Sequence, residues 1–202
     1  MEGKTFMKAL SDYIAFDLEF NEHNGKNYLI QVSAVHFCDG KEVASFDSYV
    51  HTEVPLKSFI NGLTGITSET LKDAPEVEVV LQEFQLFVGN IPLIGYNAEK
   101  SDLPILLEYG LDFSSQYQVD LYDEAFERRS SDLHGIANLK LETVAKFLGF
   151  HGQSHNSLAD ARMTALVYEA FLESDKSRLI LQEQDSLTNN PFGNLDLSQL
   201  FD

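Results

Sequence analysis

Two acidic side chains in an apolar segment are the residues best suited to chemistry, Asp17 and Glu19 within residues 16–20. The preceding residues, 13–16, are apolar and predict a buried central strand. Alternation along a strand places both carboxylates on one face. Such a pair repels unless a proton or a cation intervenes, and hard oxygen ligands suit Mg²⁺ or Mn²⁺. The alternative interpretation is an ordinary strand end whose acids face water.

Two further segments carry groups suited to the same chemistry. Tyr96-Asn97 follows a short apolar strand, and Asp102 stands at the head of the next predicted helix. His155 lies five residues before Asp160, the histidine in a loop and the aspartate on a helix. A loop histidine can accept a proton from water near neutral pH. Taken singly, Asp102 is an ordinary first-turn acid and His155 an ordinary surface histidine.

Other charged residues near these segments have simpler interpretations. Asp120 precedes a predicted helix, and we interpret it as structural. Arg128, Arg129, Lys140 and Arg162 are candidate phosphate contacts, but the favoured interpretation of each is a solvated surface charge.

The elements that must position these groups are strands first, then helices. The dipeptide Asp39-Gly40 between two strand-like runs predicts a tight hairpin. Strands are expected at 13–20, 28–38, 41–50, 91–95 and 118–121, and helices at 76–88, 98–109, 122–129, 139–148 and 158–172. This order predicts an α/β fold, with a mixed five-stranded sheet of three antiparallel strands and then shorter parallel ones, flanked by helices. Residues 54–75 are expected to be a loop region in which Thr67 caps a short helix.

Length and composition indicate one domain. The 202 residues suffice for a full core, expected over 1–173, whereas 174–202 turns polar and predicts a flexible tail. A single cysteine excludes an intramolecular disulfide and fits a reducing compartment. With neither a signal peptide nor a membrane span evident, we expect a cytoplasmic protein with no membrane partner. A net charge of −18 disfavours tight electrostatic binding of long duplexes.

In order and spacing, the three motifs resemble those of the DEDDh branch of the 3′–5′ exonucleases. This DnaQ-like, RNase H-like group includes the proofreading subunits of bacterial replicases. The resemblance covers about residues 12–173, and Asn156 excludes the branch that carries tyrosine there. Tyr96 replaces the usual histidine and Ser101 the usual phenylalanine, while residues 20–22 replace a common Thr-Thr-Gly run.

The resemblance implies a two-metal-ion reaction. Two Mg²⁺ or Mn²⁺ ions would be held by Asp17, Glu19, Asp102 and Asp160, with His155 as general base. Nucleoside 5′-monophosphates would be released from single-stranded or frayed DNA 3′ ends. Contacts with the terminal nucleotides are implied for Phe20, Leu63, Thr64, Ile66, Asn97 and Lys100, although residues 63–67 can equally be a glycine-containing turn.

Two alternatives stay open on the sequence. The substrate can be RNA or short oligoribonucleotides, because one pocket senses the 2′-hydroxyl. A non-catalytic partner subunit of a replication or repair complex is the other alternative, although a scaffold has no physical need for clustered acids. Residues 195–201 loosely resemble sliding-clamp-binding peptides, so a clamp or a polymerase subunit is a candidate partner of the tail, with a chance short motif as the alternative.

Overall fold

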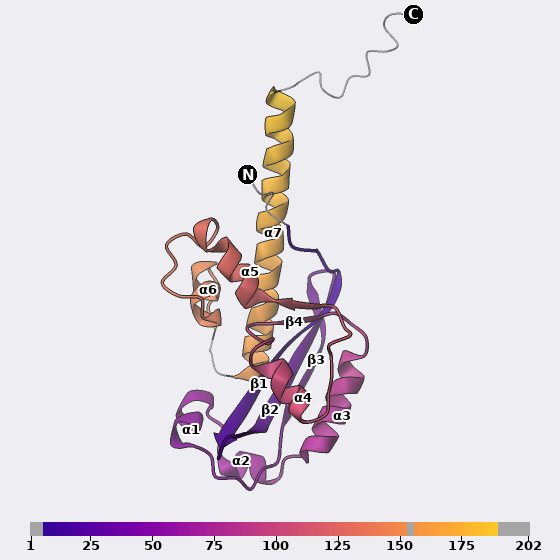
Figure 1. Cartoon of the computed structure of the whole chain (residues 1–202), viewed down its shortest axis with the longest axis vertical. Helices are drawn as coiled ribbons and strands as arrows, with labels where there is room; N and C mark the ends of the chain where they lie inside the picture. Colours follow the sequence, from indigo (N-terminus) through magenta and orange to yellow (C-terminus); the bar gives the residue numbers. More distant parts are fainter. Residues whose placement is uncertain (1–5, 153–155, 190–202) are drawn as a thin grey trace, which may run out of the picture.

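A five-stranded mixed sheet lies at the centre of the computed structural model, which describes residues 6–152 and 156–189 (Figure 1). Its strand order is β3-β2-β1-β4-β5, so the acid-bearing strand β1 is central. β1 pairs antiparallel with β2 and parallel with β4, as the sequence predicts. The strands are β1 (Asp12–His23), β2 (Lys26–Cys38), β3 (Lys41–Tyr49), β4 (Leu93–Gly95) and β5 (Gln118–Asp120).

Two tight turns join the first three strands. Asp39 and Gly40 both have positive φ, 49° and 71°, and Asn24 and Gly25 likewise have 52° and 77°. These values suit hairpin turns whose twist matches that of the flanking strands, and asparagine, aspartate and glycine tolerate them best. The predicted hairpin at Asp39-Gly40 is therefore confirmed.

The parallel strands are much shorter than β1, and this exposes part of its edge. β4 pairs with β1 only at Ile14 and Ala15 and ends at Gly95. From Phe16 onward the β4-facing edge of β1 is open to other groups. The helical elements are α1 (Ser58–Thr64), α2 (Ser68–Lys72), α3 (Val77–Val88), α4 (Asp102–Glu108), α5 (Leu121–Glu127), a 3₁₀ turn (Arg128–Ser130), α6 (Leu141–Phe147) and α7 (Ser157–Asn189).

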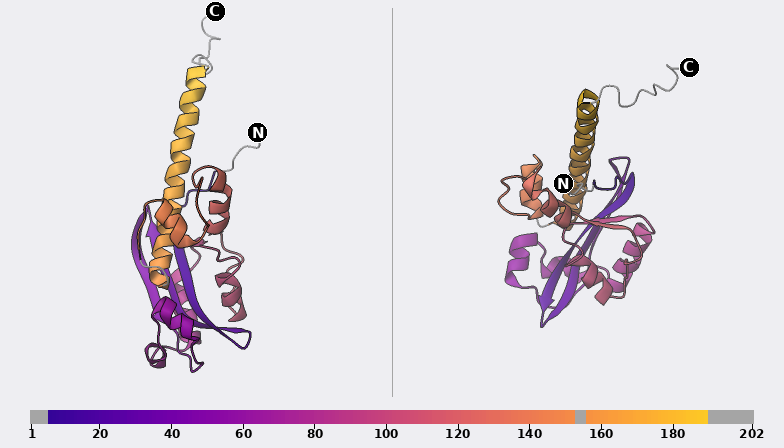
Figure 2. Two further views of the ribbon diagram at one scale, coloured as in Figure 1. Left: turned by 90° about the vertical axis from the view of Figure 1, so that its left-hand side faces the viewer. Right: turned by 45° about the horizontal axis from the view of Figure 1, so that its top comes forward.

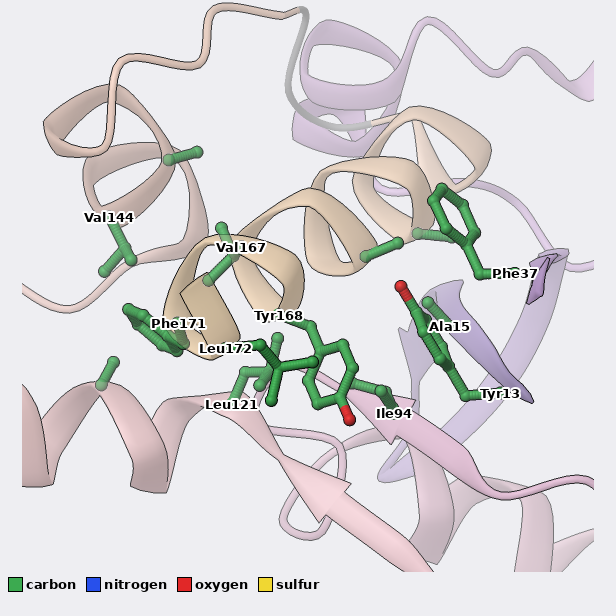
Figure 3. Close-up of a cluster of buried hydrophobic side chains, with 14 of the residues drawn as sticks. Tyr13, Ala15, Phe37, Ile94, Leu121, Val144, Val167, Tyr168, Phe171 and Leu172 are labelled. Atoms are coloured by element: carbon green, nitrogen blue, oxygen red, sulfur yellow. The ribbon is translucent and has the colours of Figure 1, made fainter. Parts of the chain in front are cut away.

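Side-chain alternation along β1 divides the core into two layers. On one face Tyr13 and Ala15 pack with Tyr168 and Phe171 of α7, and the rings of Tyr13 and Tyr168 meet edge to face at 4.8 Å (Figure 3). On the other face Ile14, Phe16 and Leu18 pack with residues of α3 and α4. Because Asp17 and Glu19 continue the first series, the sequence pattern aims both carboxylates toward the α7 face.

Residues 54–75 contain more helix than the sequence predicts. Thr67 caps α2 by accepting a hydrogen bond from the Thr70 backbone N–H at 3.1 Å, as expected. α1 precedes it and ends at Gly65, whose φ of 75° provides a left-handed C-cap. A small apolar cluster of Ile30, Ile60, Ile66 and Leu71 holds both helices against the sheet. Short helices of this kind depend on tertiary packing and leave little periodic signal.

Helix α7 continues beyond the predicted end at residue 172. It runs to Asn189 and projects past the sheet (Figures 1 and 2). The segment after residue 173 is polar, but it is rich in residues with good helix propensity, so the helix has no reason to stop. The domain division at 173 stays a prediction, although residues 174–189, which we expected to be flexible, are helical here. The clamp-like peptide at 195–201 lies outside the described residues.

An ion-pair cluster ties α7 to the 3₁₀ turn and corrects the interpretation of Arg128. The Arg128 side chain is 6% exposed, pairs with Asp175 at 2.7 Å and with Glu124, and lies 4.6 Å from the centre of the Phe171 ring. Because it is buried and paired with acids, Arg128 is neither a solvated charge nor accessible to phosphate. The local sequence contained no sign of this burial. Arg162 pairs with Glu42 at 2.8 Å. Within the described ranges, no helix combines the length and apolarity needed to cross a bilayer.

Candidate active site

Three carboxylates from two elements converge beside the sheet. Asp17 and Glu19 come from β1, and Asp160 comes from the first turn of α7. One oxygen atom of each lies within 4.8 Å of the others, and all three residues are half-buried. The strand alternation and the helix start predicted from the sequence thus bring Asp17, Glu19 and Asp160 together.

Polar contacts behind the carboxylates fix the start of α7 on the sheet. The Ser157 hydroxyl donates to the Asp17 backbone carbonyl at 3.3 Å and contacts the Ser33 hydroxyl. Ser33 in turn donates to Asp47 at 2.7 Å, which links β2 to β3. Ser157 and Ser33 are fully buried, so these contacts compensate for the lost hydration of both hydroxyls.

Asn156 begins α7 and thereby places Asp160 in the first turn. Its side-chain oxygen accepts a hydrogen bond from the Ala159 backbone N–H at 3.1 Å, and its carbonyl accepts from the Asp160 N–H at 2.9 Å. This is the preferred chemistry of a helix N-cap. The sequence contained this signal, an asparagine directly before the periodic residues of the helix.

Clustered negative charge dominates the electrostatics of the site. Removal from water raises the pKa of Asp17 well above its ordinary value, and the neighbouring Asp102, Asp160 and Glu19 raise it further. Burial, and then the charges of Asp160 and Asp102, raise the pKa of Glu19 from 4.5 to about 7. The protein alone therefore cannot keep all these groups ionised at neutral pH without a free-energy cost.

Asp102 lies beside the three carboxylates but is oriented differently. It is 5% exposed, and one oxygen accepts the Leu18 backbone N–H at 3.0 Å on the open edge of β1. The other oxygen accepts a hydrogen bond from the Ser101 hydroxyl. Burial raises the Asp102 pKa to about 6, although these hydrogen bonds oppose the shift. In the described part of the chain, the three-carboxylate cluster does not include Asp102, and its ligand role stays a prediction.

Asp120 organises the turn between β4 and α4. One of its oxygens accepts the backbone N–H groups of Asn97 at 2.7 Å and Tyr122 at 2.9 Å, and the other accepts that of Glu99 at 3.0 Å. Asn97 has a φ of 59°, a left-handed conformation that asparagine tolerates. This turn delays the start of α4 to Asp102, so the helix predicted from residue 98 begins four residues later. The structural interpretation of Asp120 is confirmed.

The remaining sequence-predicted residues differ in how far they are exposed. Leu63 is 45% exposed, whereas Ile66 is 2% exposed and packs in the small cluster with Ile30, so only Leu63 offers an apolar surface to a ligand. The Thr64 hydroxyl is used locally, donating to the Ile60 carbonyl at 2.9 Å. Phe20 is partly buried against the α3–α4 layer. His155, the predicted general base, lies outside the described residues.

Residues 21 and 22, which depart from the family pattern, hold the entry to α1. Asn21 is fully buried, donates to the Pro55 carbonyl at 3.2 Å and accepts the Lys57 N–H at 3.1 Å. Glu22 forms an ion pair with the Lys57 side chain. These residues therefore attach the segment before α1, the helix that carries Leu63, to β1, and sequence reasoning did not reveal this contact.

A groove with a volume of about 690 Å³ opens directly beside Asp160. It lies between the turn after β4, the start of α5 and the start of α6. The sequence had indicated only Asn97 and Lys140 among its other lining residues. Its walls are formed by Tyr96, Asn97, Tyr122, Asn138, Leu139, Lys140, Leu141, Glu142 and Asp160.

The carboxylate cluster fits divalent cations. Ligand oxygens around Mg²⁺ lie at about 2.1 Å from the ion, and opposite ligands are therefore about 4.2 Å apart. The three carboxylate oxygens all lie within 4.8 Å of one another, which is close enough for them to share an ion. The donors are all hard oxygens, and no soft sulfur ligand belongs to the cluster among the described residues.

Comparison with known proteins gives consistent matches. The exonuclease family model, RNase_T, matches residues 14–168. The PolC-type DNA polymerase III of Clostridium perfringens is 28% identical over 191 residues, covering 94% of this chain and 13% of that protein. The Streptococcus pneumoniae D39 enzyme of the same name is 35% identical over 163 residues, covering 75% and 11%. The chain thus spans about one eighth of the length of these relatives.

Solved structures of low sequence identity share the fold. Exonuclease I superposes with a TM-score of 0.70 at 17% identity, covering 90% of this chain and 44% of that one. The nuclease domain of 3′hExo, a DEDDh family member bound to rAMP, gives a TM-score of 0.65 at 18% identity, covering 81% and 92%. These likenesses support the RNase H-like mixed sheet.

Proposed function

We infer that this chain hydrolyses nucleic acids from their 3′ ends, because it belongs to the exonuclease family and is a DnaQ-like member of the RNase H-like superfamily. The observation that carries the proposal is the convergence of Asp17, Glu19 and Asp160 within 4.8 Å. A protein gains no stability from placing like charges together, since each raises the pKa of the others. The cluster therefore argues against a purely non-catalytic subunit.

The carboxylates would act by holding two divalent cations. Asp17, at the centre of the cluster, would contact both, while Glu19 and Asp160 would complete their coordination. Asp102, at the open edge of β1, would also bind a cation, through the oxygen that now accepts a hydrogen bond from Ser101. When bound, such ions supply charge neutralisation and activate water for attack on phosphorus.

The protein's own contribution is positioning and proton transfer. β1 and the Asn156-capped first turn of α7 hold the carboxylates on rigid elements, so little reorganisation is needed during the reaction. His155 would accept the proton of the attacking water, the role that the family resemblance implies for it. The products would be a nucleoside 5′-monophosphate and a strand shortened by one nucleotide.

We propose single-stranded or frayed DNA as the substrate. The relatives that cover most of this chain are named as DNA polymerases, which favours DNA over RNA. The net charge of −18 disfavours tight duplex binding and favours engagement of a few terminal nucleotides. Association with a polymerase is a further proposal from the same relatives.

A direct test is hydrolysis of matched 5′-labelled DNA and RNA strands with Mg²⁺, Mn²⁺ or EDTA. We expect shortening from the 3′ end, faster on DNA and abolished by EDTA. Asp17→Asn should lower the rate on the order of a thousandfold, because several kcal/mol of charge stabilisation is lost. Asp12→Asn, on the same strand but 52% exposed, is the matched control and should retain activity.

Four results would count against the proposal. Full activity of Asp17→Asn would exclude a role for the carboxylate cluster, and activity in EDTA would exclude the metal requirement. Faster degradation of RNA would favour the oligoribonucleotide alternative. Absence of degradation by the folded wild-type protein would favour a partner subunit without catalysis.

A further inference from the structure

We propose that the groove between α5, α6 and Asp160 binds the single-stranded segment on the 5′ side of the bond to be cut. This inference rests on the proposed function and specifies how an acidic protein can hold its substrate. The groove includes Asp160, one of the three clustered carboxylates, so a strand lying in it would lead directly to the reacting phosphate.

Size and lining chemistry fit a short nucleic-acid strand. A volume of about 690 Å³ lies in the range that accommodates a ligand of several rings. Tyr122 is half-buried and presents its ring to the groove, and Tyr96 supports that ring edge to face at 6.3 Å. Aromatic rings that stack on bases without reading their sequence are the usual platform for single strands.

Positive charge borders this groove although the chain is strongly acidic. Lys140 lines it and, among the described residues, takes part in none of the ion pairs. The Lys100 ammonium lies 5.5 Å from the centre of the Tyr122 ring. By contrast, Lys57 and Arg162 are both neutralised by glutamates elsewhere. Lysines beside a stacking ring can contact the phosphate backbone of a single strand while its bases stack on the ring.

Neutral polar groups complete the lining. Asn97 and Asn138 both line the groove, and amides can bond to either bases or phosphates. Glu142 also lines the groove, so its positive charge comes from Lys140 on the wall and from Lys100 beside the Tyr122 ring.

The test measures binding without chemistry. In an Asp17→Asn background, fluorescence anisotropy would follow an oligothymidylate of about eight nucleotides over a salt series. Tyr122→Leu should weaken binding about 5- to 150-fold, whereas Tyr122→Phe should bind nearly as the parent does, because the ring remains. Lys140→Gln should lower the slope of log affinity against log salt by about 0.7, and Lys140→Arg should restore it.

Lys176→Gln is the matched surface control. Lys176 lies sixteen residues beyond Asp160 on α7, about 24 Å along the helix. Its side chain is 61% exposed, so removal of its charge should change neither the affinity nor the slope. Circular dichroism of each variant checks folding, and the exposed Lys140 keeps the test valid if Tyr122→Leu does not fold.

Two outcomes would overturn the inference. Equal affinities and slopes for Lys140→Gln and the parent would show that the groove does not contact the strand. Weakening of thymidine monophosphate binding by as much as oligomer binding would assign the groove to the released nucleotide instead. Because binding is measured without turnover, an inactive wild-type protein would contradict the proposed function while leaving this inference separately testable.

Discussion

Without metal ions, the carboxylate cluster should destabilise the protein progressively as the pH rises. The pKa of Glu19 is raised from 4.5 to about 7 in the folded state. Below pH 4.5 Glu19 is protonated in both the folded and the unfolded state, so it does not lower the unfolding free energy. Between these values the unfolded chain ionises while the folded protein retains its proton. The unfolding free energy therefore falls as the pH rises, and the loss is complete above about pH 7.

The magnitude follows from the shift in the pKa of Glu19. At 1.36 kcal/mol per unit, a shift from 4.5 to about 7 corresponds to about 3.4 kcal/mol, of which about 2.5 kcal/mol appears between pH 5 and pH 8. Glu19 is half-buried, so solvent screening reduces the expected loss to about 1–2.5 kcal/mol. Bound Mn²⁺ would remove the penalty, because it replaces the proton as the neutralising charge.

Urea unfolding in EDTA at pH 5 and pH 8 measures this loss. The wild-type protein should lose about 1–2.5 kcal/mol more than Glu19→Gln over this range, because the amide cannot titrate. With Mn²⁺ in place of EDTA, the wild-type protein should regain that stability at pH 8. If both proteins respond equally to pH in EDTA, the cluster does not raise the pKa of Glu19 and the electrostatic argument for the metal site is refuted.

Two further substitutions test the framework around the site. Arg128→Met should lower the unfolding free energy by about 1–3 kcal/mol in urea, because the buried Asp175 loses the nearer of its two arginine partners, whereas the exposed neighbour Arg129→Met should change it by less than about 0.5 kcal/mol. A small effect of Arg128→Met would show that the ion-pair cluster is not needed. Gly95→Ala would place a methyl group 2.2 Å from the Ala98 side chain and should cost about 1–3 kcal/mol in thermal unfolding, with lower hydrolysis, whereas Gly62→Ala meets no atom within 4 Å. Equal melting of these two glycine variants would exclude the clash.

The sequence predicted those parts of the molecule whose signals are local. Alternation along residues 13–19 placed Asp17 and Glu19 on one face, and the residues before Asp160 indicated a helix start. The sequence therefore predicted that these three carboxylates belong to one site, and the structure brings them together. The hairpin at Asp39-Gly40 was predictable for the same reason, since the two residues determine the turn by themselves.

Other features depend on partners that are distant in sequence. Arg128 is buried because Asp175, 47 residues away, pairs with it, and no local pattern indicates that contact. Ile66 is buried because it packs with Ile30 and Leu71, which are distant or only partly predictable neighbours, so its substrate contact stays a prediction. Tyr122 became a candidate binding residue only once the fold placed it in the groove beside Asp160.

The same reasoning accounts for the acidity of a chain that acts on a polyanion. Charge counted over the whole sequence predicts weak binding, but affinity for a strand end depends on the charges within about a Debye length of the site, near 10 Å. There the acids would be neutralised by bound cations, while Lys100 and Lys140 keep their positive charge next to Tyr122. The proposed preference for a short single-stranded end therefore depends on where these lysines lie, and the change in salt slope caused by Lys140→Gln measures that dependence directly.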